Sequence, residues 1–376
     1  MVFKTPFLLS IFFVFFLVSP SLCAPIDDVV SCLTHNSINN FTTFPSKTEN
    51  PNCTANNYYF KLLDFSIQNL RFAEPKVPKP IAIILPDSAE QVKSSVLCCT
   101  KASVEIRVRC GGHSYEGTSA VANDGAPFVI VDMINMNRVM VDSESETAWV
   151  EGGATLEDCK EMSWIESILF FSGLSNGSSI SDLKNRYLQD KNYFKAKSDY
   201  VKTQISFTGI KAALDILEKE PKGYVILDPY GGLMNKISSD SIAFPHRKGN
   251  LFTIQYLVAW YEENNEKSDG YIEWIRELYK AMTPFVSWGP RAAYVNYMDV
   301  DLGVVEFINT GSDVPSQDED IVEIARAWGE NYFLKNYDRL VRAKTLIDPN
   351  NIFTHQQAIF PMSFSSSYSM ALEART

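Results

Sequence analysis

The sequence predicts an α+β fold, and two patterns carry that prediction. A β-α-β unit spans residues 81–108, where two short strand-like runs flank a segment with helical periodicity. Two amphipathic helices dominate the second half of the chain, at residues 268–282 and 318–328. Strands gathered in the first third and helices in the remainder are typical of the α+β class.

The β-α-β unit follows from local signals along the chain. Residues 81–85 form a short apolar run that ends at Pro86, as expected of a buried strand. Residues 87–90 have the spacing of a capping box, which predicts that a helix begins there. Residues 104–108 alternate as a strand does. The apolar stripe of the helix consists of Val92, Val96 and Cys99.

Residues 128–131 and 148–150 are read as further strands. A turn at residues 132–138 separates them, and Gly152-Gly153 ends the second. The two later helices are predicted from apolar side chains at helical spacing, which form the buried face by default. These side chains are Ile272, Ile275, Leu278 and Met282 in the first helix, and Ile321, Ile324 and Trp328 in the second.

The composition excludes several classes of protein. With 376 residues, 45% of them hydrophobic, the chain has the length of two or three domains and enough apolar side chains for a substantial core. The net charge is -11 and contains no long block of like charges, so a nucleic-acid surface is not indicated. The histidines and cysteines lack the spacing of a zinc site, so no metal is expected.

Residues 1–23 are read as a secretory signal peptide. An apolar run at residues 7–18 follows Lys4, and small residues precede a cleavage position near residue 23. An uncleaved membrane anchor is the alternative, but the run is shorter than the ~20 residues that a span needs, and Pro20 breaks its end. We therefore expect a secreted protein of the extracellular space or cell wall, with the vacuole as the alternative.

Secretion changes how the cysteines and glycosylation sequons are read. Because the endoplasmic reticulum oxidises thiols, one or more disulfides are expected. The same route exposes sequons to the glycosyl transferase. The sequons begin at Asn40, Asn52 and Asn176.

A tight turn after residues 104–108 presents His113. Gly111 and Gly112 remove side-chain bulk and allow positive φ, so backbone N–H groups can face an anion or a flat ring at close range. A neutral imidazole held there can attack an activated methyl carbon, act as a base, or serve as a hydrogen-bonded turn residue. The spacing leaves these three roles open.

The segment Arg-Val-Arg-Cys-Gly-Gly-His-Ser-Tyr-Glu-Gly-Thr-Ser at residues 107–119 resembles the flavin-attachment loop of plant berberine bridge enzyme-like oxidases, in the vanillyl-alcohol oxidase superfamily. The resemblance extends over almost all of the chain after residue 23. It is carried by further motifs at residues 32–33, 149–156, 162–167, 194–200, 228–232, 244–247, 296–297 and 348–350.

The resemblance implies a two-lobed PCMH-type FAD-binding domain beside an antiparallel-sheet substrate domain with helices. It also implies that His113 bonds covalently to the 8α carbon of FAD. Members oxidise alcohols, sugars or alkaloids by hydride transfer to the flavin, and oxygen reoxidises it, so a small molecule and oxygen are the expected partners of a monomer. The implied cofactor-binding residues are His113, Arg109, Gly111, Gly112, Ser114, Tyr115, Gly117 and Ser119.

The same resemblance implies the catalytic residues. Tyr297 aligns with a tyrosine that deprotonates substrate in several members, and Gln255 and Tyr115 would face the substrate. A tyrosine with a pKa of about 10 needs a nearby positive charge, or hydrogen bonds that favour the phenolate, to act as a base at neutral pH. Here the sequence departs from the family, because Thr253 and Met298 replace basic residues of some relatives. The alternatives are a half-buried strand tyrosine at position 297 and packing of Tyr115 on the flavin.

Two further assignments rest on the resemblance. It pairs Cys32 with Cys98, which would tie the N-terminal segment to the first helix of the β-α-β unit, and Cys99 is the competing partner. The motif at residues 244–247 contains His246, which we interpret as part of a structural turn and not as a second catalytic histidine.

The resemblance is interrupted after Leu156, because Glu157 begins a stretch that resembles the middle of the substrate domain. We therefore expect that a large internal block is absent, together with the cysteine that bonds flavin C6 in many members. The expected divisions are the N-terminal part of the FAD-binding domain at 24–156, a remnant substrate domain at 157–290, and a C-terminal, berberine-like return to the FAD domain at 291–376.

Two hypotheses on function follow. The first is a secreted, FAD-dependent oxidoreductase. The second is a catalytically inactive, truncated family member without a complete flavin site, arising from alternative splicing, an incomplete gene model or gene decay.

Overall fold

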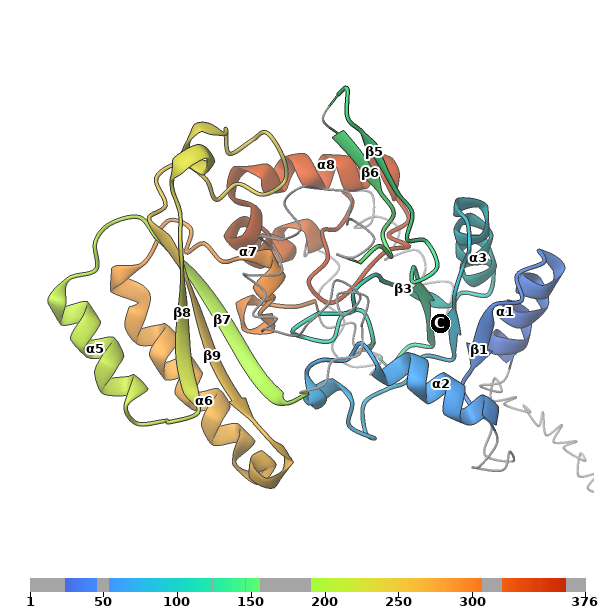
Figure 1. The fold of residues 1–376 in the computed structure, drawn as a ribbon, viewed down its shortest axis with the longest axis horizontal. Helices are drawn as coiled ribbons and strands as arrows, with labels where there is room; N and C mark the ends of the chain where they lie inside the picture. The colour runs from blue at the N-terminus through green and yellow to red at the C-terminus, as the bar shows by residue number, and fades with distance from the viewer. Residues whose placement is uncertain are drawn as a thin grey trace, which may run out of the picture.

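The computed structural model describes residues 24–45, 54–122, 125–145, 147–155, 191–305 and 320–362. A four-stranded sheet with helices comes first in the chain, a three-stranded sheet with helices second, and a pair of helices last (Figure 1). Several predictions fall outside the described residues: the signal peptide, the sequons at Asn52 and Asn176, and the junction between Leu156 and Glu157.

The first sheet has the strand order β1-β2-β4-β3. Its strands are β1 (Phe41–Thr43), β2 (Ala82–Ile84), β4 (Phe128–Asp132) and β3 (Glu105–Arg109). Both β2 and β3 pair with β4 in parallel, so the predicted β-α-β unit forms through α3 (Ala89–Lys101) with β4 inserted between its two strands. β1 pairs antiparallel with β2 at the edge.

Helices cover both faces of this sheet because its strands contribute apolar side chains to a core on each face. On one face, α1 (Ala24–His35) and α3 pack against Val129 and Val131. On the other face, α2 (Thr54–Asp64) packs against Phe128 and Ile130. Burial on both faces is typical of parallel strands and explains their continuous apolar runs.

The N-cap of α3 is one residue later than the capping-box spacing predicted. The Ser88 hydroxyl accepts a hydrogen bond from the amide of Gln91 at 3.3 Å, and the Gln91 side chain accepts one from the amide of Asp87 at 2.9 Å. Ser88 and Gln91 therefore satisfy two amides at the start of the helix, although the Gln91 side chain reaches back to Asp87 and not to the N-cap residue itself.

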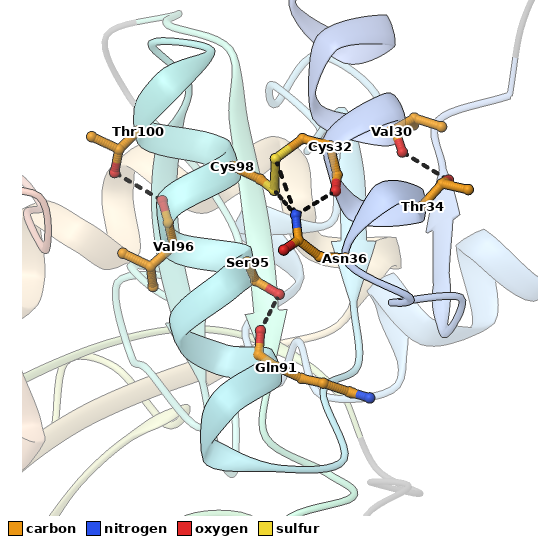
Figure 2. The surroundings of a disulfide bond; sticks show 9 residues. All are labelled: Val30, Cys32, Thr34, Asn36, Gln91, Ser95, Val96, Cys98 and Thr100. Atoms are coloured by element: carbon orange, nitrogen blue, oxygen red, sulfur yellow. Dashed lines mark hydrogen bonds between the residues drawn. A yellow bond between two sulfur atoms is a disulfide. The ribbon is translucent and has the colours of Figure 1, made fainter.

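A disulfide between Cys32 and Cys98 joins α1 to α3 (Figure 2). Beside it, the amide nitrogen of Asn36 donates to the carbonyl of Cys32 at 2.8 Å. The competing partner, Cys99, is a buried thiol. The bridge forms between the pair that the resemblance implied.

A hairpin of β5 (Val139–Asp142) and β6 (Thr147–Val150) follows the first sheet and projects from the body of the protein (Figure 1). The strand β5 was not predicted from the sequence. Large apolar side chains on the hairpin are exposed, including Met140 at 60% and Trp149 at 69%.

The second sheet is antiparallel, with β9 (Phe252–Trp260) between β7 (Tyr193–Val201) and β8 (Gly223–Pro229). Helices α5 (Phe207–Leu217) and α6 (Ser268–Met282) lie along one face (Figure 1), where Trp260, Ile275 and Leu278 belong to one apolar core. Helix α6 has the bounds predicted from the sequence, but periodicity did not predict the three strands of this sheet. Only the resemblance implied this sheet.

The C-terminal part contains α7 (Ile321–Phe333) and α8 (Tyr337–Ile347), which share an apolar core with Ala293 and Phe360. Beyond α8, Phe353 forms a bridge with Ile106 of β3, so this segment lies beside the first sheet. Short 3-10 turns complete the described structure at Leu70–Phe72, Gly232–Lys236, Glu262–Lys267, Thr283–Phe285, Val295–Tyr297, Val300–Leu302 and Leu334–Asn336.

Candidate functional site

The loop of residues 110–119 leaves the carboxyl end of β3, and two of its glycines have positive φ. The φ angle is 76° at Gly112 and 66° at Gly117. A Cβ atom at Gly112 would lie 2.5 Å from the Ser66 hydroxyl, and one at Gly117 would lie 2.5 Å from the Phe72 ring. Both positions therefore require glycine, and the loop packs closely against the segment of residues 66–72.

His113 is exposed at the tip of this loop. A Cβ atom at Gly111 would lie 2.7 Å from the imidazole ring, so the ring lies over Gly111 because no side chain blocks it. The hydroxyl of Ser114 accepts a hydrogen bond from the amide of Thr118 at 3.1 Å, which closes the loop. Ser119 is half-buried just beyond it. The imidazole is thus accessible from solvent.

The Arg109 side chain is fully buried and points into the core, not toward the loop. Its Nε atom forms an ion pair with Asp132 at 2.5 Å, and its other nitrogens donate to the carbonyls of Leu62 and Leu63. Its guanidinium also lies over the Phe65 ring. The structure therefore gives this guanidinium a structural role. A contact between Arg109 and the cofactor stays a prediction, and it would have to be made by the main chain of Arg109.

The three predicted catalytic residues come together from three separate segments. The rings of Tyr115 and Tyr297 stack nearly parallel, with centroids 5.5 Å apart and an interplanar angle of 13°. The side chain of Gln255, on β9, donates to the Tyr115 hydroxyl at 3.0 Å. Tyr115 also packs edge-on against Phe194 of β7 at 5.1 Å. The cluster lies on the face of the second sheet that α5 and α6 do not cover.

Tyr297 ends the 3-10 turn Val295–Tyr297, so the strand alternative for this residue was wrong, although the side chain is half-buried. Burial is the main cause that raises the pKa of Tyr297 to about 12, and the neighbouring Tyr115 and Asp228 raise it further. These neighbours are phenol and carboxyl groups, which disfavour the phenolate. At neutral pH the Tyr297 hydroxyl is therefore protonated.

The residues of the loop fit a flavin nucleotide, and Ser66 is the observation that tests this. Ser66 is 1% exposed, lies against Gly112, and its hydroxyl has no hydrogen-bond partner within the described part of the chain. A buried hydroxyl is normally satisfied, so its free hydrogen is a donor that the cofactor can use. No motif around Ser66 marked it in the sequence; only the fold brings it to the loop.

His246 is structural, as the sequence suggested. Its ring is buried, stacks on Tyr200 at 4.0 Å, and hydrogen-bonds through Nε2 with the carbonyl of Tyr332 at 2.8 Å. Burial lowers the pKa of His246 to about 4, so the imidazole is neutral at physiological pH.

The sequon asparagine Asn40 is half-buried before β1, where its carbonyl accepts a hydrogen bond from Leu85. A cavity of about 1000 Å³ lies elsewhere, between residues 70–76 and the start of α6, and the predicted site residues do not line it. Among the described residues no His, Cys, Asp or Glu cluster is suited to a metal, and no helix is long and apolar enough to cross a membrane.

Comparison with known proteins agrees with this geometry. The family model described as "Berberine and berberine like" matches residues 293–360, and the model described as "FAD binding domain" matches residues 80–180. The berberine bridge enzyme-like D-2 protein of Nicotiana tabacum is 39% identical, over 92% of this chain and 94% of its own length. The reticuline oxidase of Papaver somniferum is 31% identical, over 88% and 92%.

The solved structure of berberine bridge enzyme from Eschscholzia californica has a TM-score of 0.76 and 28% identity, covering 89% of this chain and 99% of that one. The α+β class and the PCMH-type architecture are thereby confirmed. The matched domains, the relatives and the shared fold show that the chain belongs to the berberine bridge enzyme-like family of FAD-binding oxidoreductases.

Proposed function

We propose that this chain is a secreted oxidoreductase that holds FAD covalently through His113 and oxidises a small molecule, with oxygen as the final acceptor. The substrate class is an alcohol, a sugar or an alkaloid. The alkaloid option has support from relatives named reticuline oxidase and tetrahydroberberine oxidase. The working unit is a monomer without nucleic-acid or membrane partners.

One observation carries the proposal. The exposed imidazole of His113 and the ring of Tyr115 lie two residues apart on one loop, and Tyr115 contacts both Gln255 and Tyr297. A cofactor attached at His113 would therefore lie beside the only phenol and amide groups that the resemblance assigns to substrate. FAD, when bound, supplies the acceptor for a hydride.

The protein groups have distinct tasks in this proposal. The glycine backbone and the Ser66 hydroxyl bind the cofactor, and the apolar surface around Phe194 and Leu257 excludes water from one side of the site. The Gln255 amide fixes the orientation of the Tyr115 hydroxyl. Tyr297 exchanges a proton with the substrate, which its high pKa makes slow at neutral pH.

The second candidate function is that of an inactive, truncated family member. Its support is that the match to the tobacco relative runs over 534 residues, whereas this chain has 376, so the alignment leaves family positions unfilled. The exposed Met140 and Trp149 on the β5–β6 hairpin are apolar surface of the kind that a neighbouring segment covers in a complete domain. Division into segments at 24–156, 157–290 and 291–376 remains part of this proposal.

The decisive experiment is secretion from a eukaryotic host followed by a search for covalent flavin. We expect a yellow protein that keeps its flavin after acid precipitation, and a peptide containing His113 whose mass includes FAD. His113→Ala should abolish the covalent flavin, whereas His35→Ala, at an exposed histidine of α1, should leave it unchanged. A colourless wild type would overturn the first function and support the second.

The role of Tyr297 has a separate test, the pH dependence of oxidation with a panel of sugars, benzylic alcohols and reticuline. Because the pKa of Tyr297 is raised to about 12, the phenolate fraction grows about tenfold per pH unit between pH 7 and 10. The rate of flavin reduction should rise with it. Tyr297→Phe should remove this slope, and Tyr58→Phe on α2 should keep it; an unchanged slope in Tyr297→Phe would assign the base elsewhere.

A further inference from the structure

The buried side chain of Asn69 joins the cofactor loop to the substrate sheet. Its Nδ2 atom donates to the carbonyl of Tyr115 at 2.9 Å and to the carbonyl of Phe194 at 3.0 Å. Its Oδ1 atom accepts from the amides of Phe194 and Arg71, both at 3.3 Å. An asparagine amide has two donor hydrogens and two acceptor lone pairs, and here all four are used.

Asn69 acts toward β7 as a neighbouring strand would. Both main-chain groups of Phe194 face the Asn69 amide on the outer edge of β7, because β9 pairs with the opposite edge. The pairing continues at Asn192, which bridges to Asn69 and whose carbonyl accepts from the amide of Leu70. The second donor contact, to the Tyr115 carbonyl, then holds the loop beside Phe194.

The next residue along both segments is also tied. Glu116 follows Tyr115 and Lys195 follows Phe194, and their side chains form a buried ion pair. Lys195 in turn pairs with Asp299 at 2.7 Å, two residues beyond Tyr297. Consecutive loop residues are therefore held against consecutive strand residues, which defines one register between them.

We propose that Asn69 is a positioning residue that sets this register and thereby fixes where His113 and Tyr115 stand relative to Gln255 and Tyr297. That Asn69 anchors the loop to β7 is inferred from the hydrogen bonds alone. That this anchoring affects the covalent flavin rests on the proposed function. Without the amide, the Tyr115 carbonyl loses its tie to β7, and only the side chains of Tyr115 and Glu116 still hold the loop against the second sheet.

The test compares Asn69→Ala with Asn336→Ala. Asn336 is a matched control, because its buried amide also donates to loop carbonyls, those of Ser239, Ile242 and Ala243, but far along the chain from the cofactor loop. Amide hydrogen exchange at Gly117 and Thr118 reports on the loop, since these amides bond to Ser114 and not to Asn69. The covalent flavin content of the His113 peptide reports on the consequence.

We expect exchange at Gly117 and Thr118 to become at least about tenfold faster in Asn69→Ala, in line with the loss of buried hydrogen bonds. Covalent flavin should fall several-fold in the same variant. Asn336→Ala should lower the melting temperature comparably while leaving both readouts unchanged. Asn69→Ser, whose hydroxyl keeps one bond, replaces the alanine variant should the latter fail to fold.

Loop exchange within twofold of the wild type would overturn the proposal, and so would wild-type covalent flavin despite fast exchange. A wild type without flavin would refute the proposed function but not the anchoring of the loop by Asn69. In that case the exchange rates at Gly117 and Thr118 alone decide whether Asn69 anchors the loop.

Discussion

Strands β4 and β7 are both buried along their whole length, but by opposite means. β4 presents apolar side chains to two helix-covered cores, Val129 on one face and Ile130 on the other. β7 carries Lys195, Lys197 and Asp199 toward the helices, where other segments supply counter-charges. An apolar strand needs only apolar neighbours, whereas a charged strand is buried only if specific partners arrive.

The partners of β7 come from distant parts of the chain. Lys195 and Lys197 share the carboxylate of Asp299, which follows the Tyr297 turn. Asp199 forms an ion pair with Arg291, which precedes that turn, at 2.5 Å. Removing one partner leaves an uncompensated buried charge, so the second sheet depends on the C-terminal return in a way that the first sheet does not.

The largest expected effect is therefore that of Lys195→Met. Loss of this ammonium leaves the buried Glu116 with only a longer ion pair, to the partly exposed Arg71 at 3.9 Å, which should lower the free energy of unfolding by about 3 kcal/mol. Urea denaturation measures it. Lys211→Met is the control, since its pair with Asp215 is exposed and its loss should barely change the stability. A cost below about 1 kcal/mol for Lys195→Met would remove the contrast between the strands.

The next effect concerns pH, through the buried His246 at the end of the second sheet. Its pKa is lowered by burial to about 4, against about 6.5 in an unfolded chain. Between these values the unfolded state binds a proton that the folded state does not, so stability falls as pH falls. This group should cost about 2 kcal/mol between pH 7.5 and pH 5.

His246→Gln should remove that part of the pH dependence, because the amide can still donate to the Tyr332 carbonyl but does not titrate. Urea midpoints at the two pH values give the comparison. An equal loss of stability in the variant and the wild type would assign the effect to other groups, and His35→Gln at the exposed end of α1 should leave it intact.

The smallest expected effect is in β4. Ile130→Val removes one methylene group from a fully buried site, which should cost about 1 kcal/mol. The same change at Ile226, which is 41% exposed on β8, should cost clearly less. Thermal unfolding monitored by circular dichroism resolves the two, and equal costs would mean that burial in the two sheets is energetically alike.

The same contrast explains what the sequence could predict. The strands of the first sheet could be predicted because burial on both faces requires continuous apolar runs. Helix α6 could be predicted because its one apolar stripe repeats at helical spacing. β7 was not recognised as a strand, because the sequence Lys-Ala-Lys-Ser-Asp looks like a solvated segment unless its partners are known.

The candidate site divides in the same way. Gly112 and Gly117 could be recognised as turn positions around His113, because their positive φ angles favour glycine. Ser66 and Asn69 carry no such mark. Their roles arise only when segments more than forty residues apart along the chain meet, which no local pattern encodes.

The amide of Asn69 has one more effect, on solubility. Because it occupies the main-chain groups of Phe194, the outer margin of β7 cannot recruit an extended segment from another molecule at that point. Within the described sheet, β8 is the opposite margin. At Phe194, strand addition from another molecule is therefore blocked by a side chain of the protein itself, beside the cofactor loop.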